Sequence, residues 1–323
     1  MNIAILDDYA DAFRQLDCYQ RLKDHEVVVF RDTEQDPVKL AKRLADADAV
    51  VLTQARSAFP RAVIERLPKL KLVSLTGKNA RHVDVEACTQ QGIAIAARGK
   101  GDAHGPAELA WGLIMCAMRN LPEEIARMKS GGWQGSVGHG LFGKTLGIYA
   151  YGRIGSIVAA VGRAFGMRVV CWGREGSTVR AREAGFEVAS DRESFFADAD
   201  VLSLHLPMNE STRGIVTAQD LARMKPTALL VNVSRSRLIG DEVLVGALRA
   251  GRPGFAAVDV YDREPVLDPA HPLLTMRNVT CTPHLGYVQW STLQSYYGAA
   301  VDNILAFAAG KPANILNPEA LRA

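Results

Sequence analysis

Short apolar runs alternate with amphipathic segments along the first hundred residues. The runs lie at 2–6, 25–30, 48–53, 70–76 and 92–96, and the segments between them include "PVKLAKRLAD" and "PRAVIERL". Apolar runs of this length are typical of strands buried on both faces, whereas the intervening apolar spacing is typical of helices. Strands that alternate with helices predict an α/β fold with a parallel sheet covered by helices on both sides.

A second series of the same kind follows. Its apolar runs are "TLGIYA", "MRVVCW", "FEVA", "VLSLHL", "ALLVNV", "GFAAVDV" and "NVTCTP", again with helical segments between them. Between the two series, residues 105–131 predict one long helix with Pro106 in its first turn. Residues 288–310 predict an amphipathic helix near the end of the chain. The sequence therefore predicts two doubly wound units.

A glycine motif, "LGIYAYGRIGSIV", begins the second series. A strand, a glycine turn and a helix are how dinucleotide-binding folds hold a pyrophosphate: Gly152 lets the backbone approach it, and Gly155 lets the helix pack on the strand. Ala150 replaces the usual first glycine, which we expect to be tolerated if its φ stays negative. The site is still expected to bind a nucleotide.

The late position of this motif bears on the domain organisation. It suggests a nucleotide-binding domain of residues 99–288 inserted into a discontinuous domain of residues 1–98 and 289–323, with ligands in the cleft between them. The alternative is that the C-terminal helix belongs to the second unit.

The strand after the glycine motif ends at Trp172 and is followed by Gly173 and Arg174. An NAD-binding unit usually presents a carboxylate here to the ribose hydroxyls, and no acid stands at these positions. An arginine beside a glycine can instead bind a 2′-phosphate. We therefore favour NADP(H) over NAD(H), with the alternative that Arg174 is a solvated loop cation and either cofactor binds.

Three polar residues each follow a strand of the second series: Arg235, Glu264 and His284. Singly, each has a structural explanation as a loop cation, a turn acid before a proline and a capping imidazole. Jointly they suit hydride transfer between a 2-hydroxy acid and a nicotinamide, which needs a proton-transferring base, its partner and a cation for the carboxylate and carbonyl. His284 would transfer the proton, Glu264 would favour its imidazolium form, and Arg235 would hold the substrate. Asp259 either accepts from the nicotinamide amide or caps a loop.

Composition narrows the function classes. The chain has 323 residues with 48% hydrophobic and 23% charged residues, which is enough for more than one core. Its formal charge of +3 is carried by scattered residues, so nucleic acid is not expected as a partner. No apolar stretch is long enough for a membrane span or signal peptide. Five scattered cysteines without CxxC spacing suggest a reducing cytoplasm, and the histidines show no metal-ligand spacing, so no metal is expected.

The sequence resembles the D-isomer-specific 2-hydroxyacid dehydrogenase family over nearly its whole length. The resemblance is carried by "GKTLGIYAYGRIG", "HLPMNESTRGIV", "LLVNVSRSRLIGDEVLVGALRAG", "DVYDREPV", "TPHLG" and "GKPANILNP". It implies a Rossmann-type NAD(P)-binding domain inserted into a flavodoxin-like substrate domain, usually in a homodimer. It assigns to Arg235, Glu264 and His284 the roles given above.

The same resemblance implies further site residues. The segment "SLTGKNARHVD" matches the family's substrate loop, so the backbone of Gly77, Lys78 and Asn79 would hold the substrate carboxylate, and Arg56 of "QARS" would face the same site. The implied cofactor residues are Arg153 and Ile154 along the pyrophosphate, and Leu206, Pro207, Val233 and Ser234 beside the adenosine and nicotinamide parts. Lys78 departs from the common "GAGVD", and either binds a second anionic group of the substrate or points into water.

We therefore expect a cytoplasmic NAD(P)-dependent enzyme that reduces a small 2-keto acid to the D-hydroxy acid. The alternative from another class is a dinucleotide-sensing binding protein without turnover, because relatives of this fold include corepressors. A formate-dehydrogenase-like activity is disfavoured, since that branch resembles this chain but has glutamine where Glu264 stands.

Overall fold

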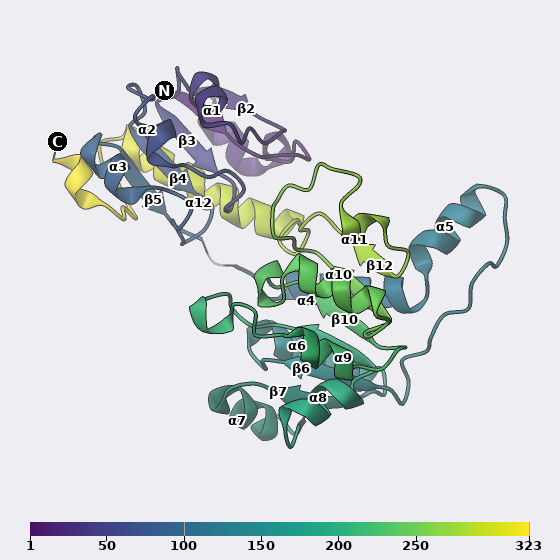
Figure 1. Cartoon of the computed structure of the whole chain (residues 1–323). Helices are drawn as coiled ribbons and strands as arrows, with labels where there is room; N and C mark the ends of the chain where they lie inside the picture. Colours follow the sequence, from purple (N-terminus) through teal and green to yellow (C-terminus); the bar gives the residue numbers. More distant parts are fainter. Residues whose placement is uncertain (100, 323) are drawn as a thin grey trace. The chain divides into compact units, whose positions relative to one another are not determined.

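The computed structural model describes residues 1–99 and 101–322 and contains two compact units (Figure 1). The first unit combines Met1–Gly101 with Val288–Ala323, and the second comprises Asp102–Tyr287. The second unit is thus inserted in sequence into the first. Each unit is built around one parallel sheet, so the α/β fold is confirmed.

The first unit has a five-stranded sheet of order β2-β1-β3-β4-β5, the flavodoxin-like order. Its strands are β1 (Asn2–Ile5), β2 (Glu26–Val29), β3 (Ala49–Leu52), β4 (Leu72–Leu75) and β5 (Ala94–Ala97). Its helices are α1 (Pro37–Arg43), α2 (Arg61–Ile64), α3 (Val85–Gln90) and α12 (Trp290–Ala308), with short 3-10 turns at Phe13–Gln15, Asp17–Leu22 and Pro318–Leu321. α12 packs on β4 and β5, where the Ser74 hydroxyl donates to the carbonyl of Ala300 (3.0 Å).

The second unit has a seven-stranded sheet of order β12-β11-β10-β9-β6-β7-β8, which contains the Rossmann-type order. Its strands are β6 (Thr145–Tyr149), β7 (Arg168–Trp172), β8 (Glu187–Val188), β9 (Val201–Leu204), β10 (Leu229–Asn232), β11 (Phe255–Val258) and β12 (Val279–Cys281). Its helices are α4 (His104–Met118), α5 (Leu121–Lys129), α6 (Arg153–Ala164), α7 (Glu175–Glu183), α8 (Arg192–Asp198), α9 (Ala218–Arg223), α10 (Asp241–Arg249) and α11 (Pro272–Thr275), with 3-10 turns at Glu210–Thr212 and Ser236–Leu238.

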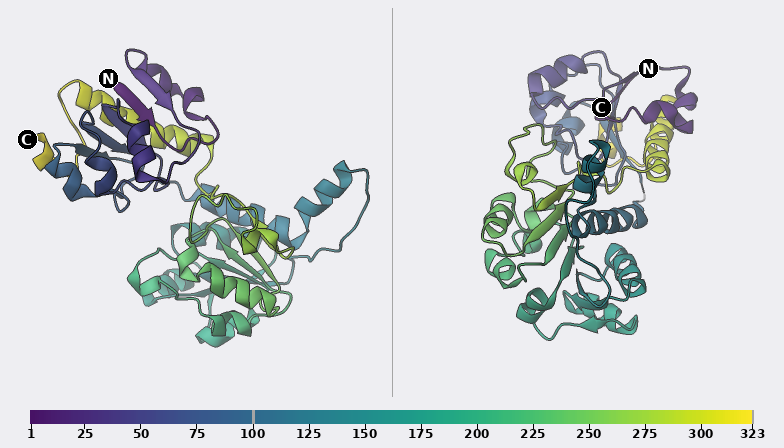
Figure 2. Two further views of the ribbon diagram at one scale, coloured as in Figure 1. Left: turned by 45° about the horizontal axis from the view of Figure 1, so that its top comes forward. Right: turned by 90° about the vertical axis from the view of Figure 1, so that its right-hand side faces the viewer.

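Both faces of the second sheet are apolar and covered by helices (Figure 2, right). In β10, Leu229 and Val231 face the core formed with α4, α6 and α7, whereas Leu230 faces the core formed with α8 to α11. Successive residues of a strand point to opposite faces, so an apolar run without alternation is what a sheet covered twice requires. This is why the strands could be recognised from short apolar runs.

The predicted single helix over residues 105–131 is wrong. The structure has two helices, α4 and α5, separated at Asn120, which adopts the left-handed conformation (φ 51). Pro122 follows in the first turn of α5. A proline lacks the backbone N–H and its ring clashes with the carbonyl four residues earlier, so Pro122 is tolerated in the first turn of a new helix but not in the interior of a continuous one. Asparagine tolerates the left-handed turn better than most residues.

Candidate active site

Strained backbone marks the carboxyl ends of strands in both units. Among the described residues, Asp7, Gln54, Ala150 and His284 have positive φ (61, 54, 76 and 54), and each lies within three residues of a strand end. Such conformations cost on the order of 1–3 kcal/mol and cluster at functional sites. Ligands of open α/β sheets bind at the carboxyl ends of strands. Both observations point to the same edge of each sheet.

The glycine motif lies between β6 and α6, as the sequence predicts. Gly152 precedes the first turn of α6, and a Cβ added to it would meet no atom within 4 Å, so the space over its backbone is open. A Cβ at Gly155 would lie 2.5 Å from the carbonyl oxygen of Ala150, so only glycine permits this helix to approach the strand. The first-turn amides of α6 lack intrahelical partners by helix geometry. These features fit a dinucleotide pyrophosphate.

The expectation of a negative φ at Ala150 is wrong. Its φ is 76, a conformation that costs a residue with a Cβ about 1–2 kcal/mol more than glycine. The turn is held by two bonds: the Ala150 amide donates to the Trp172 carbonyl (2.7 Å), and the Tyr151 amide donates to the Ser177 hydroxyl (2.7 Å). Ser177 was missed from the sequence, because no motif signals a contact across 26 residues.

Gly173 and Arg174 follow β7. A Cβ on Gly173 would lie 3.0 Å from the Ser177 hydroxyl, so this glycine permits the close approach of α7 to the glycine turn. Arg174 caps α7 and is exposed, and its guanidinium donates to the hydroxyl of Ser211. A second arginine, Arg180, donates to the Tyr151 carbonyl (3.2 Å). One arginine therefore lies in the loop that follows β7, and the guanidinium of the other bonds to the glycine turn that follows β6.

Arg153 and Ile154 begin α6, and four further proposed cofactor residues follow β9 and β10, which are adjacent parallel strands. The Ser234 hydroxyl donates to the carbonyl of Leu206 (2.5 Å), which joins the two strand ends. Pro207 follows Leu206 and is exposed, whereas Val233, which precedes Ser234 in the chain, is buried. Burial lowers the pKa of the neighbouring His205 to about 4, so its imidazole is neutral near pH 7.

His284 and Glu264 form a pair. His284 Nδ1 lies 2.7 Å from Glu264 Oε2, and both side chains are about four-fifths buried. The other Glu264 oxygen, Oε1, accepts from the Tyr261 amide (2.9 Å). A carboxylate on Nδ1 fixes the orientation of the imidazole and leaves Nε2 for chemistry. This is the arrangement required of a histidine that exchanges a proton with a substrate.

Asp259 holds the turn that carries His284. Its Oδ1 accepts from the Thr282 hydroxyl (2.7 Å) and the Leu285 amide (2.6 Å), and its Oδ2 accepts from the Gly286 amide (3.0 Å). Burial raises the pKa of the Asp259 carboxyl above its ordinary value, while the bonds from Thr282 and Leu285 oppose that rise. Of the two interpretations made from the sequence, the loop contact is therefore observed.

Arg235 lies at the end of β10, and β10, β11 and β12 are successive neighbours in the sheet. Its carbonyl accepts from the Asn232 side-chain amide (2.9 Å), and one guanidinium nitrogen donates to the Ser234 carbonyl (2.6 Å). Asn232 also accepts from the Ser234 amide (3.1 Å). The three predicted residues thus follow three adjacent strands, and two of them are in direct contact.

The predicted substrate residues follow β3 and β4 of the first unit, which are also neighbours. The Gln54 amide donates to the Thr76 hydroxyl (2.8 Å), which joins the segment of Arg56 to that of Gly77, Lys78 and Asn79. Asp7 accepts from Ser57 (2.9 Å), and the Arg56 charge opposes the rise that burial causes in the pKa of this carboxyl. Lys78 is exposed and lines a cavity of about 460 Å³ with Arg21, Arg98 and Asp302.

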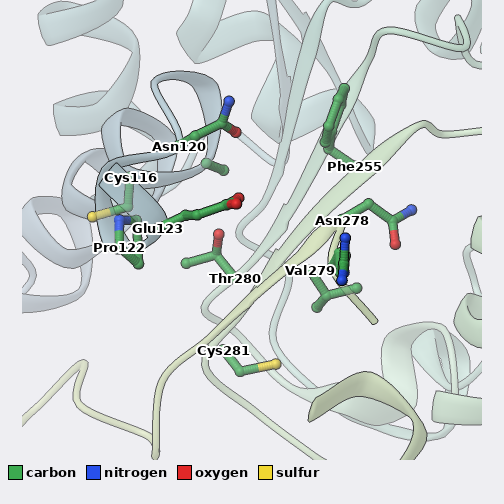
Figure 3. Close-up of a pocket in the computed structure, with 11 residues that line it drawn as sticks. Cys116, Asn120, Pro122, Glu123, Phe255, Asn278, Val279, Thr280 and Cys281 are labelled. Atoms are coloured by element: carbon green, nitrogen blue, oxygen red, sulfur yellow. The ribbon is translucent and has the colours of Figure 1, made fainter. Parts of the chain in front are cut away.

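A different cavity, of about 190 Å³, lies between the α4–α5 junction and β12 (Figure 3). Glu123 and Thr280 point toward one another across it. Its lining includes Arg277, Asn278 and the whole of β12 (Val279–Cys281) but none of Arg235, Glu264 and His284, so this cavity differs from the candidate site.

Two structural features are absent from residues 1–99 and 101–322. No group of three or more histidine, cysteine, aspartate or glutamate side chains is placed to bind a metal ion. None of the helices in this part of the chain has both the length and the apolar character that crossing a membrane demands.

Comparison with known proteins identifies the family. Residues 111–286 match the model of the D-isomer specific 2-hydroxyacid dehydrogenase, NAD binding domain. The chain is 34% identical over 311 residues to a glyoxylate reductase of Aeropyrum pernix, covering 93% of this chain and 92% of that protein. It is 36% identical over 250 residues to a D-3-phosphoglycerate dehydrogenase of Methanocaldococcus jannaschii, covering 77% of this chain but only 47% of that longer protein.

Among solved structures, a phosphoglycerate oxidoreductase from Vibrio cholerae aligns with a TM-score of 0.92 and 44% identity, covering 96% of this chain and 99% of that one. An oxidoreductase from Ralstonia solanacearum aligns with a TM-score of 0.95 and 48% identity, covering 99% and 98%. The fold and the strand-end residues thus define a dinucleotide-binding α/β protein of the oxidoreductase class. The chain belongs to the D-isomer-specific 2-hydroxyacid dehydrogenase family.

Proposed function

We propose that the protein is an NAD(P)-dependent D-2-hydroxyacid dehydrogenase that reduces a small 2-keto acid. The observation that carries the proposal is the His284–Glu264 pair, with a 2.7 Å contact, at the carboxyl edge of a sheet that also bears a dinucleotide-type glycine turn. A binding protein without turnover needs the glycine turn but has no need of a carboxylate that orients an imidazole. Family membership supports the same conclusion.

His284, Glu264 and Arg235 have different roles in the proposed reaction. The nicotinamide, when bound, supplies the hydride that is added to the keto carbon. His284, kept in position by Glu264, gives its proton to the keto oxygen, and the reverse transfer accompanies oxidation. Arg235 binds the carboxylate with its planar fork and stabilises the negative charge that develops on the oxygen.

Asp259 retains capacity for the cofactor. A carboxylate offers about four acceptor sites, and three bonds to Asp259 are described above, two on Oδ1 and one on Oδ2. The remaining site on Oδ2 suits the amide of the nicotinamide. Arg153, Ile154 and the glycines of the turn would hold the pyrophosphate, and Leu206, Pro207, Val233 and Ser234 would border the rest of the dinucleotide.

We propose NADP(H) as the preferred form, because Arg174 in the loop after β7 and Arg180 on the glycine turn can bind a 2′-phosphate. On the substrate side, the backbone of residues 77–79 would hold the carboxylate, with Arg56 nearby. We assign the first unit to the substrate and the second to the cofactor.

A spectrophotometric screen tests substrate and cofactor together. Glyoxylate, hydroxypyruvate, pyruvate, phenylpyruvate and oxaloacetate are each assayed with NADH and with NADPH. We expect turnover of at least one keto acid, with higher kcat/KM for NADPH. Equal efficiency with both cofactors would remove the NADP(H) preference. Tight dinucleotide binding without turnover of any keto acid would favour the sensor instead.

We also propose a homodimer formed by the segment after α4. α5 and residues 130–142 extend away from the sheet of their own unit (Figure 2, left). This segment exposes apolar side chains, among them Ile125, Met128, Trp133 (73% exposed) and Val137 (93% exposed). Exposed apolar groups that gather in one place mark interaction surfaces, and a second copy is the commonest partner in soluble oligomers.

The five cysteines, all unpaired, support a reducing cytoplasm as the location of the protein.

Sedimentation of the purified chain tests the dimer. We expect twice the mass of one chain, and a Val137→Asp variant to sediment mainly as monomer at micromolar concentration. A two-fold interface contains each residue twice, so one substitution buries two charges and weakens association by roughly 100-fold or more. Glu123→Asp, in α5 of the same segment and without a change of charge, is the control. A monomeric wild-type protein would contradict this proposal.

A further inference from the structure

Tyr261 bonds to Glu264 and to the turn that carries His284. It follows β11 and is 7% exposed. Its backbone amide donates to Glu264 Oε1 (2.9 Å), and its hydroxyl donates to the carbonyl oxygen of Thr282 (3.0 Å). That same carbonyl accepts the backbone amide of His284 (3.0 Å). One residue therefore bonds to the carboxylate on one side and to the turn of the imidazole on the other.

We propose that Tyr261 is a positioning residue that holds His284 and Glu264 in the orientation in which their side chains contact each other. This inference rests on the proposed function of that pair. The amide of Tyr261 engages one oxygen of Glu264, so the other oxygen is presented to His284 Nδ1. The hydroxyl fixes the carbonyl that begins the His284 turn. Bonds at both ends restrict the pair more tightly than the contact between its members does alone.

The backbone at His284 explains why such support is needed. Its φ of 54 lies in the left-handed region, which residues with a Cβ rarely adopt unless surrounding contacts enforce it. Two sets of contacts do so here. Asp259 binds Thr282, Leu285 and Gly286, and the Tyr261 hydroxyl binds Thr282 from the other side. Losing the hydroxyl should loosen this turn without unfolding it, because Asp259 still holds it.

The surroundings of Tyr261 keep its hydroxyl available as a hydrogen-bond donor. The His271 ring packs edge-on against the tyrosine ring, with centroids 5.8 Å apart, and so limits its rotation. Burial raises the pKa of the phenol above its ordinary value, and the nearby Cys281, Asp259 and Glu264 raise it further. The hydroxyl therefore stays protonated, and able to donate, near neutral pH.

Tyr261→Phe removes the hydroxyl and keeps the ring, so it tests this contact with little change in packing. We expect kcat for keto-acid reduction to fall about tenfold, as is typical when one hydrogen bond that orients a catalytic group is lost. KM, and the Kd for reduced dinucleotide measured by its fluorescence, should stay within about twofold. In the cofactor-free protein, hydrogen exchange of the peptide spanning residues 282–287 should become several-fold faster, since it reports local opening.

Tyr149→Phe is the matched control. Tyr149 is buried in the same unit, and its hydroxyl accepts from Arg192 (3.3 Å) far along the sheet from His284. We expect its kcat and its exchange at residues 282–287 to equal those of the wild type, with any change confined to the melting temperature. An equal loss of kcat in both variants would show a general packing effect and overturn the proposal.

The two readouts separate this inference from the proposed function. If the wild type turns over no keto acid but exchange at residues 282–287 rises in Tyr261→Phe alone, the enzymatic assignment fails and the support of the turn by Tyr261 stands. If the wild type is active and Tyr261→Phe matches it in kcat and exchange, the proposed function stands and the positioning role is wrong.

Discussion

His284→Ala should lower kcat/KM for keto-acid reduction by ~10² to 10⁴-fold, because general acid catalysis contributes a factor of that order. The loss should lie mainly in kcat, since the imidazole is needed for proton transfer rather than for holding the dinucleotide. The Kd for NADPH or NADH, followed by fluorescence, should remain within about threefold of the wild-type value. Steady-state kinetics with the keto acid and the reduced dinucleotide is the measurement.

Glu264→Gln provides an intermediate variant. Glutamine can still contact Nδ1 of His284 but carries no charge to stabilise the imidazolium, so a smaller fall of about 10- to 100-fold is expected. His25→Ala is the control, because His25 lies beside the amino end of β2 and contacts the chain's first amino group (3.3 Å). Full activity of His284→Ala, or losses of similar size in His25→Ala, would contradict the assignment.

Much of this site was predictable because parallel strands bring their carboxyl ends to one edge. The apolar runs located β10, β11 and β12, so the polar residues that follow them could be assigned to one region before any coordinates. The contact between His284 and Glu264 then agrees with the prediction that the acid partners the base. The glycine turn was predictable for a similar reason, since strand, glycines and helix are contiguous in sequence.

What the sequence did not predict depends on contacts between distant residues or on individual backbone angles. Ser177 supports the glycine turn from 26 residues away, and Tyr261 reaches Thr282 across 21 residues. The positive φ of Ala150 runs against the local preference of alanine and occurs in a turn held by the Trp172 carbonyl and the Ser177 hydroxyl. The break at Asn120 depended on weighing one proline against a long helical pattern. Tertiary context decided each of these cases.

Arg235→Lys should lower kcat/KM by ~10²-fold, although the positive charge is kept. A guanidinium presents two parallel donors, so one group can bind a carboxylate oxygen and the adjacent keto oxygen together, whereas an ammonium is a single point charge. We expect KM to rise because the carboxylate is held less well, and kcat to fall because the charge developing on the keto oxygen loses a donor. Arg235→Ala should lose a further ~10-fold, and neither variant should alter the Kd for the dinucleotide, measured by fluorescence.

Arg237→Lys is the matched control, because it makes the same change of side chain two residues away. Arg237 is exposed in the 3-10 turn that follows Arg235. Its kinetic constants should equal those of the wild type. If Arg235→Lys were as active as the wild type, a simple charge would suffice, and the bidentate role would be wrong. If Arg235→Ala were also fully active, the substrate carboxylate would have to be held elsewhere, with the backbone of residues 77–79 the first place to look. A lower kcat combined with a higher KM in Arg235→Lys is therefore the result that requires a planar fork beside the His284–Glu264 pair.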